Sequence, residues 1–212
     1  MKQYEHSSLI TRVKTTQKVV AITFDDGPNP YYTPLLLEFF REYNVKATFY
    51  MIGQQIEAHG ETAIAVHAAG HEIGNHTYSH PHLPELGREQ QLSELVKAEE
   101  LMVKITGSKP LTCRPPYLEF DEPLITLMES LDYRIVSALN LETEDWRDPG
   151  PGLDRILNKT RDHIVPGSIL LFHDGFGDRS QTMEAVEILV KEYTKQGYQF
   201  VTVSDLLKLA QS

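Results

Sequence analysis

Short hydrophobic runs alternate along the chain with longer amphipathic stretches. Val19–Phe24 is a mostly hydrophobic run rich in β-branched residues, which favours a buried strand. A loop containing Gly and Pro follows it, and Thr33–Tyr43 then has the spacing of an amphipathic helix. The same order recurs. It predicts seven strands, with helices between them: Val19–Phe24, Ala47–Ile52, Glu72–Gly74, Leu111–Arg114, Arg134–Ala138, Ser168–Phe172 and Gln199–Thr202.

Strands that alternate with helices form a parallel sheet covered by helices, so the predicted fold class is α/β. The longest predicted helix is Arg88–Ile105, and Gly107 follows it as a stop signal. Periodicity does not separate an open sheet from a closed barrel, but the polar clusters favour a barrel. They stand at or soon after the ends of five strands, where the loops of (β/α) barrels build active sites. These clusters are Asp25–Asp26, His76–His80, Arg114, Asp145–Trp146 and His173–Asp174.

The length and composition are those of a single globular domain. A chain of 212 residues with 41% hydrophobic and 24% charged residues builds one substantial core. We divide it into a polar lead-in, residues 1–17, and one domain, residues 18–212. The formal net charge is −10, from 20 Lys and Arg against 30 Asp and Glu. This acidic balance argues against a nucleic-acid partner and favours a neutral substrate.

The chain has one cysteine, Cys113, so an intrachain disulfide is impossible. We expect Cys113 to be a buried small residue, because no activating base can be assigned to it. No hydrophobic stretch is long enough to span a bilayer, and Met1–Gln17 lacks the hydrophobic run of a signal peptide. The protein is therefore expected to be cytoplasmic, or to be extracellular or at the cell surface if a targeting segment has been removed. We expect it to be a monomer.

Two short clusters predict a metal site. His76 and His80 are four residues apart, so on one helical turn both imidazoles reach the same ion; alone, the pair is equally consistent with surface histidines. Asp25 and Asp26 follow a buried strand, and a turn before Gly-Pro explains only one of these two carboxylates. Two histidines and one carboxylate leave an open metal position, as in catalytic sites. The other carboxylate is then free to act as a base, and spacing does not tell which aspartate binds the ion.

Five motifs in fixed order give a more specific indication. They are Thr23–Pro28, His76 with His80, Arg114–Tyr117, Asp145–Trp146 and Leu171–Asp174. Together they resemble the motifs of the NodB-homology polysaccharide deacetylases, carbohydrate esterase family four. The similarity runs from about Lys18 to Leu209. It implies a distorted (β/α) barrel, often with seven strands, which agrees with the strand count above.

The resemblance implies a role for each matching residue. Asp25 corresponds to the general base of the family, and Arg114 would pair with it. Asp26, His76 and His80 correspond to ligands of one divalent metal ion. We expect zinc, with cobalt, nickel or manganese as alternatives.

The remaining motifs imply the acid and the substrate contacts. His173 corresponds to the general acid, and Asp145 would orient it. The backbone N–H of Tyr117 would hold the oxyanion together with the metal, while Trp146 and Leu171 would form a pocket for the acetyl methyl group.

The sequence departs from the family pattern at two places. Leu118 stands where the family usually has Gly, and Glu142–Glu144 precedes Asp145 where the fourth motif often begins with Asp. Neither change removes a catalytic group, so both bear on substrate preference. Among other residues, we expect His59, His67, His71 and His82 at the surface, and Phe39, Phe40 and Tyr43 in the core.

The predicted function is metal-dependent removal of N-acetyl groups from an N-acetylglucosamine polysaccharide, peptidoglycan or chitin-like, by metal-bound water with an Asp base and a His acid. A glycosidase using Asp25 is an alternative, but it leaves the histidine pair unused. A non-catalytic carbohydrate-binding relative should have lost at least one of these groups. A metal-dependent amidase or esterase acting on acetylated xylan or a small molecule shares the chemistry and stays open.

Overall fold

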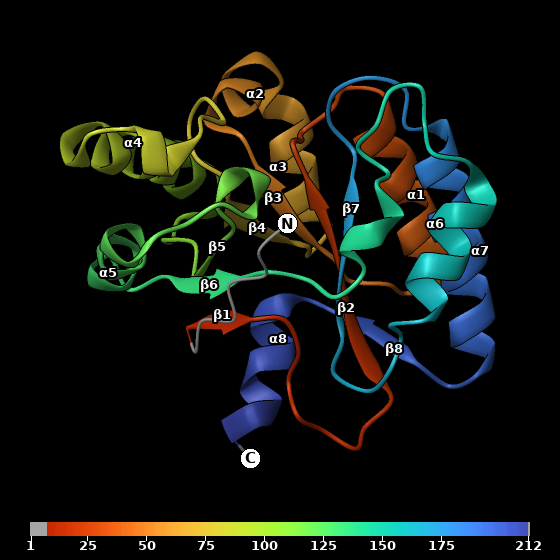
Figure 1. Cartoon of the computed structure of the whole chain (residues 1–212). Coiled ribbons are helices and arrows are strands. Elements are labelled where there is room, and N and C mark those ends of the chain that lie inside the picture. Colours follow the sequence, from red (N-terminus) through yellow and green to blue (C-terminus); the bar gives the residue numbers. More distant parts are fainter. Residues whose placement is uncertain (1–7, 212) are drawn as a thin grey trace.

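A computed structural model of the chain describes residues 8–211 and shows a central sheet surrounded by helices (Figure 1). All strand pairs are parallel, in the order β1-β6-β5-β4-β3-β2-β7, and β8 also pairs with β2. The strands are β1 (Leu9–Ile10), β2 (Val19–Asp25), β3 (Thr48–Met51), β4 (Glu72–Asn75), β5 (Thr112–Cys113), β6 (Arg134–Val136), β7 (Ile169–His173) and β8 (Gln199–Val201).

The seven predicted strands are confirmed with small shifts at their ends, and β1 is an additional strand. Its two residues lie in the polar lead-in and pair with Ile135 and Val136 of β6. A pairing between segments so far apart leaves no local hydrophobic pattern, which is why the sequence did not reveal it. Residues 1–7 of the lead-in lie outside the described residues.

The predicted α/β fold is confirmed, and the two ends of the strand order approach each other. The N–H of Val13 donates to the carbonyl of Gly167 (2.9 Å), and Arg12 and Ser168 form an isolated antiparallel bridge. The N–H of Leu139 donates to the carbonyl of Ile169 (3.1 Å). Single backbone contacts of this kind, without a continuous ladder, bring the β1–β6 edge of the sheet close to β7.

The helices cover the sheet on both sides. Figure 1 shows α1, α6 and α7 on one side, α4 and α5 on the other, and α8 below the strands. No helix within residues 8–211 combines the length and hydrophobicity that a membrane span requires. The helices are α1 (Tyr32–Tyr43), α2 (Gly53–Ala58), α3 (Gly60–Ala68), α4 (Arg88–Thr106), α5 (Glu122–Ser130), α6 (Leu153–Arg161), α7 (Ser180–Lys195) and α8 (Val203–Lys208), with 3₁₀ turns η1 (Leu83–Glu85), η2 (Pro116–Leu118), η3 (Leu141–Thr143) and η4 (Leu209–Gln211).

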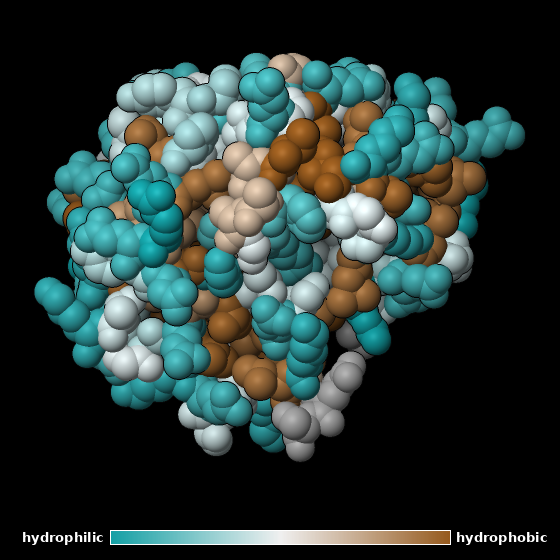
Figure 2. Space-filling view, turned by 180° about the vertical axis from the view of Figure 1, so that it is seen from behind, coloured by the Kyte–Doolittle hydropathy of each residue, from teal (hydrophilic) through white to brown (hydrophobic). Residues whose placement is uncertain are grey.

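Aromatic side chains fill the core between the sheet and α1. The Phe24 ring lies 5.2 Å from Phe49 and 6.0 Å from Phe172, and Phe40 is fully buried against it. All seven residues of β2 are buried, which explains why this strand is a hydrophobic run without alternation. Each buried Phe stabilises the fold by about 1.5–3 kcal/mol relative to an exposed one. The surface in Figure 2 is mixed, with separate hydrophobic patches among polar residues.

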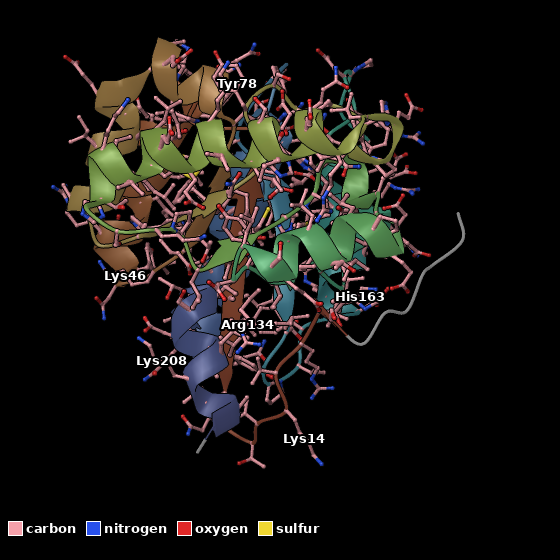
Figure 3. The ribbon with its side chains drawn as sticks, turned by 90° about the vertical axis from the view of Figure 1, so that its left-hand side faces the viewer. Lys14, Lys46, Tyr78, Arg134, His163 and Lys208 are labelled. Carbon is pink, nitrogen blue, oxygen red and sulfur yellow. The ribbon has the colours of Figure 1, made fainter. Side chains whose placement is uncertain are left out.

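The parallel strands point their carboxyl ends toward one end of the molecule. Tyr78 follows β4 and lies at the opposite end from Lys46, which precedes β3, and Arg134, which begins β6 (Figure 3). Residues that end or follow these strands therefore meet at a single edge.

Candidate active site

The candidate site lies at the carboxyl edge of the sheet. Asp25 ends β2 and is paired in register with His173, which ends β7. His76 directly follows β4, and Arg114 directly follows β5. The parallel register thus brings together residues that are up to 148 positions apart in the chain.

Asp26, His76 and His80 form a group that fits a metal ion. Asp26 Oδ1 lies 3.5 Å from His76 Nε2 and 3.2 Å from His80 Nε2, and one ligand atom of each residue lies within 4.8 Å of the others. Asp26 Oδ1 is buried and accepts no hydrogen bond from the described residues, which is costly unless a cation is near. Burial raises the pKa of Asp26, but His76, His173 and His80 outweigh it and lower this pKa to about 2.

The two imidazoles present nitrogen lone pairs to this group. His76 Nδ1 lies 2.6 Å from the carbonyl of Arg114, which fixes the proton on Nδ1 and leaves Nε2 as the ligand atom. Burial and the charge of His76 lower the pKa of His80 to about 4, so His80 is neutral at pH 7. For His76, burial lowers the pKa, but Asp25 and Asp26 raise it more. A bound cation competes with this proton.

The prediction that His76 and His80 share a helical turn is wrong. Residues 76–80 form a loop after β4, and Thr77 (φ 68°) and His80 (φ 60°) have left-handed backbone conformations. The Glu94 carboxylate on α4 accepts hydrogen bonds from the N–H groups of Tyr78 (3.0 Å) and Ser79 (2.8 Å). The convergence of the histidines therefore depends on a loop that α4 holds in place.

Asp25 forms the expected ion pair with Arg114. Arg114 is fully buried, and its Nη1 lies 2.7 Å from Asp25 Oδ1 and 2.7 Å from Thr23 Oγ1. Its other nitrogens donate to the carbonyls of Val136 (3.3 Å) and Ser137 (3.0 Å). The guanidinium thus makes four hydrogen bonds to the described residues, which fix the geometry of the pair.

The Tyr50 ring packs against the Arg114 guanidinium, with its ring centroid 4.3 Å from Arg114 Cζ. A Cβ atom at Gly74 would overlap this ring. We expect Gly74→Ala to lower the free energy of unfolding by about 1–3 kcal/mol, because the buried ring has no free space to move into. Urea denaturation followed by circular dichroism measures this effect.

Tyr50→Phe is the matched control. The Tyr50 hydroxyl is buried and makes no hydrogen bond to the described residues, so its removal should leave the free energy of unfolding unchanged or raise it. Equal stability of Gly74→Ala and the unmodified protein would contradict the steric argument.

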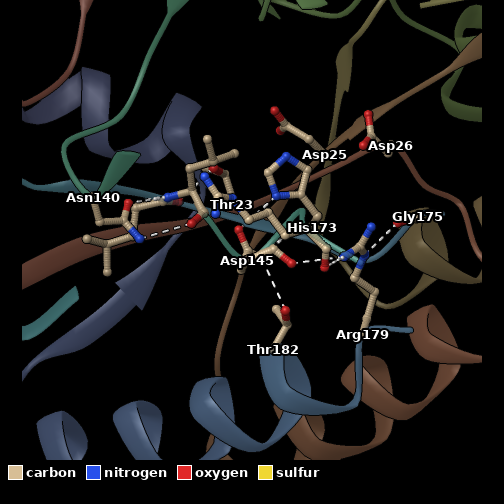
Figure 4. Close-up of polar contacts among 12 residues, drawn as sticks. Thr23, Asp25, Asp26, Asn140, Asp145, His173, Gly175, Arg179 and Thr182 are labelled. Atoms are coloured by element: carbon tan, nitrogen blue, oxygen red, sulfur yellow. Dashed lines mark hydrogen bonds and ion pairs between the residues drawn. The ribbon is translucent and has the colours of Figure 1, made fainter. Parts of the chain in front are cut away.

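His173 lies between Asp145 and the adjacent aspartates Asp25 and Asp26 (Figure 4). Its Nδ1 is 2.9 Å from Asp145 Oδ1, and its backbone N–H donates to Asp145 Oδ2 (2.8 Å). Burial lowers the pKa of His173, but the charge and hydrogen bond of Asp145 raise it to about 9, with Asp26 and Asp25 adding to the effect. The arrangement holds an imidazolium at neutral pH.

Sequence analysis missed the residues that position Asp145. The buried Arg179 donates to the carbonyls of Gly175 (2.9 Å) and Asp145 (2.9 Å), and Thr182 Oγ1 donates to Asp145 Oδ2 (3.2 Å). A cation directly before α7 is unfavourable to the helix dipole, and this was the available signal for a special role of Arg179.

Asn140 was also missed. Its side-chain amide donates to the carbonyl of Leu171 (2.9 Å) and accepts from the Leu171 N–H (2.7 Å). The Asn140 side chain therefore makes the hydrogen bonds that a neighbouring strand would make to β7. These bonds hold the segment that leads to Asp145 in place. An asparagine in a loop gives no signal of this role.

Asp174 fixes the loop that follows Asp26. Thr33 Oγ1 donates to the Asp174 carboxyl and accepts from the Asn29 N–H (2.8 Å). A Cβ atom at Gly27 would lie 2.6 Å from Asp174 Oδ1, so only glycine permits this approach. Burial raises the pKa of Asp174 to about 7. The Thr33 hydrogen bond lowers this pKa, whereas the charge of Asp26 raises it further.

The residues expected to contact substrate border the metal group. The Tyr117 ring lies 4.6 Å from His80, and its side chain is 54% exposed. Trp146 is 53% exposed directly after Asp145, and Leu171 is buried two residues before His173. Leu118, at the position of the expected glycine, has φ 54°, a conformation that strains a branched residue.

The outcomes for the other histidines differ. His71 was expected to be solvated, which is wrong: it is buried between Phe40 and Phe49, and its Nδ1 accepts from the Ala47 N–H (3.1 Å). Burial, with Lys46, lowers the pKa of His71 to about 4. His82 is exposed as expected, but it stacks on Tyr117 at 4.0 Å.

The expectations for Cys113 and α1 are confirmed. Cys113 is buried, and burial raises the pKa of its thiol, so it is no nucleophile. On α1, Phe40 is fully buried, with Phe39 and Tyr43 packed against the same cluster.

Known proteins resemble the chain in both sequence and fold. The profile of the family described as polysaccharide deacetylase matches residues 12–136. A peptidoglycan-N-acetylglucosamine deacetylase of Bacillus cereus is 36% identical over 209 residues, covering 98% of this chain and 97% of that protein. A chitooligosaccharide deacetylase of Azorhizobium caulinodans is 30% identical over 199 residues, covering 88% and 93%. The crystal structure of a peptidoglycan N-acetylglucosamine deacetylase has a TM-score of 0.87 at 31% identity, covering 94% and 92%.

Proposed function

Because this chain belongs to the polysaccharide deacetylase family, we propose that it removes N-acetyl groups from N-acetylglucosamine residues of peptidoglycan or a chitin-like chain. One observation carries the proposal: the Asp26–His76–His80 group lies beside two separately held groups, Asp25 and His173. The hydrolysis of an amide needs an electrophilic centre, a base and an acid, and this edge of the sheet supplies candidates for all three.

Asp26, His76 and His80 would hold one divalent cation, and two imidazoles with one carboxylate are a donor set typical of catalytic zinc. When bound, such an ion lowers the pKa of a water ligand and polarises the acetyl carbonyl. Zinc is our proposal for its identity, since imidazole ligands suit zinc and the group leaves positions open.

The chain's own residues would move the protons. Asp25, held by Arg114, accepts a proton from the attacking water, and His173 donates a proton to the leaving nitrogen. The backbone N–H of Tyr117 stabilises the oxyanion, while Trp146 and Leu171 enclose the acetyl methyl group. The C–O bond would form first and give the tetrahedral oxyanion, and the C–N bond would then break as the nitrogen is protonated, which yields acetate and a free amine.

The test is acetate release from chito-oligomers and peptidoglycan, with acetylated xylan and small acetamides as competing substrates. We expect acetate without shortening of the sugar chain, and amide oligomers as the preferred substrates. Chain shortening without acetate would indicate a glycosidase, and small acetamides turned over as fast as oligomers would contradict the polymer assignment.

Removal of the metal tests whether acetate release requires a bound cation. Treatment with a chelator is expected to reduce acetate release to background, and added zinc should restore it, because the carboxylate and imidazoles alone do not activate water sufficiently. The circular dichroism spectrum of the chelator-treated protein controls for loss of structure. Full activity of a protein shown to be free of metal would contradict the proposal.

A further inference from the structure

Exposed aromatic side chains continue beyond the candidate site on one side. Phe176 lies in the loop between β7 and α7, and its ring centroid is 6.5 Å from that of His80. Its side chain is 49% exposed. The aromatic border that Tyr117 forms on one side of His80 is thus matched by Phe176 in a different loop.

The Phe176 loop is tied to the start of α1. Asp178 Oδ1 accepts a hydrogen bond from the Tyr32 hydroxyl (2.8 Å), and this link joins the loop to α1 across 146 residues of sequence. Tyr31 packs edge-on against Tyr32, with ring centroids 4.9 Å apart. Tyr31 is 66% exposed, the largest fraction among the large hydrophobic side chains described as exposed.

A hollow lies where these residues meet α7, and we call it the Tyr31 hollow. Its volume is about 300 Å³. It is lined by Tyr31, Tyr32, Leu35, Ser180, Met183, Glu184 and Glu187. Lys191 pairs with Glu187 (3.1 Å), whereas Glu184 forms no ion pair with the described residues. The hollow therefore combines aromatic and aliphatic surface with an acidic rim.

We propose that the Tyr31 hollow binds a pyranose ring of the substrate chain at a distance from the ring that is deacetylated. The proposal rests on the proposed function and adds a second point of contact to it. The chemistry fits: a pyranose has an apolar C–H face that packs on an aromatic ring, and its hydroxyls donate to carboxylates at the edge. A volume at the lower end of roughly 300–1,000 Å³ for ligand sites suits one ring.

The loop that follows β7 links the hollow to the candidate site, which favours substrate over an unrelated partner. The ring centroid of Phe176 lies 6.5 Å from that of His80, and Asp178, two residues later, accepts a hydrogen bond from the Tyr32 hydroxyl. A glycan that left the site over Phe176 would extend along this loop toward the Tyr31 hollow. The acidic rim disfavours an anionic occupant and accepts a neutral or an amino sugar.

Tyr31→Ala tests the proposal, because Tyr31 is largely exposed and its removal leaves no core cavity. We expect the ratio of kcat/KM for chito-hexamer to that for chitobiose to fall about 5–10-fold, mainly through KM for the hexamer. Tyr31→Phe should keep the ratio, and Glu184→Gln should lower it less than Tyr31→Ala. Ile64→Ala, an exposed hydrophobic position on α3, is the matched control and should leave the ratio unchanged.

Calorimetric titration with chito-hexamer measures sugar binding independently of acetate release. Weaker binding by Tyr31→Ala than by Ile64→Ala supports the proposal even if the unmodified protein releases no acetate, an outcome that would overturn only the proposed function. Equal length dependence and equal hexamer binding for both variants would overturn the hollow as a sugar site. A change of oligomeric state in Tyr31→Ala would instead identify a second copy of the chain as the occupant.

Discussion

Replacement of Asp25 with asparagine is expected to lower acetate release by roughly 10²–10⁴-fold while metal binding persists. The introduced amide would still accept the Arg114 hydrogen bond, but it would no longer accept a proton from water. Asp25 Oδ2 is 3.7 Å from His76 Nε2, whereas Asp26 Oδ1 lies closer to both imidazoles, at 3.5 and 3.2 Å. These distances favour Asp26 as the ligand and leave Asp25, paired with Arg114, as the candidate base.

Asp26→Asn should fail in a different way. It replaces an anionic ligand by a neutral one, so the affinity for metal should fall, and excess metal should restore part of the activity. Metal content and acetate release are measured on both variants, with Asp154→Asn on the exposed side of α6 as a control. Loss of metal from Asp25→Asn with retention in Asp26→Asn would reverse the two assignments.

The second large effect is expected for Asp145→Asn, which should lower kcat by roughly 10²–10⁴-fold and shift its alkaline limb to lower pH. His173 must be protonated to serve as an acid, and its pKa of about 9 keeps it so at neutral pH. Activity of the unmodified protein should thus fall as pH rises through about 9. Without the Asp145 charge, the largest influence that raises the pKa of His173 is lost, so this pKa falls and activity is lost at lower pH.

The pH profile of kcat for both proteins tests this expectation, and Thr182→Val, which removes only one hydrogen bond to Asp145, should shift the limb less. An unchanged limb in Asp145→Asn would show that His173 is not the acid.

The raised pKa of His173 also affects stability. A pKa that is higher in the folded than in the unfolded state stabilises the fold fully below the unfolded value, about 6.5, and this contribution is lost as pH rises through about 9. The free energy of unfolding of His173→Gln should therefore depend less on pH between 6 and 10 than that of the unmodified protein. His67→Gln, at an exposed position of α3, is the control.

The sequence was most informative where structure is local. The hydrophobic run Val19–Phe24 and the amphipathic stretch Thr33–Tyr43 became β2 and α1 with shifts of one residue. The convergence of Asp26, His76 and His80 was predictable because parallel strands end at one edge. Their local backbone was not, since left-handed residues at Thr77 and His80 depend on the Glu94 contacts made across the fold.

Residues that act at long range escaped prediction for one physical reason. His71 is buried because Phe40 and Phe49 close over it, and those contacts are set by the packing of α1 on the sheet. Arg179 and Asn140 bind backbone carbonyls, which every residue has, so their partners leave no mark in the sequence.

The position of β2 has a consequence for the synthesis of the chain. One edge of β2 pairs with β7, along Ala21–Asp25, and the other is shared by β3, along Thr23–Asp25, and β8, along Val19–Ala21. The ribosome makes this hydrophobic strand early and its remaining partners last, so nascent chains must carry β2 with an unpaired edge. The segment that matches the family profile, residues 12–136, lacks both late strands. A fragment of residues 12–136 would therefore leave the β7 edge of β2 without a partner, and we expect it not to fold on its own.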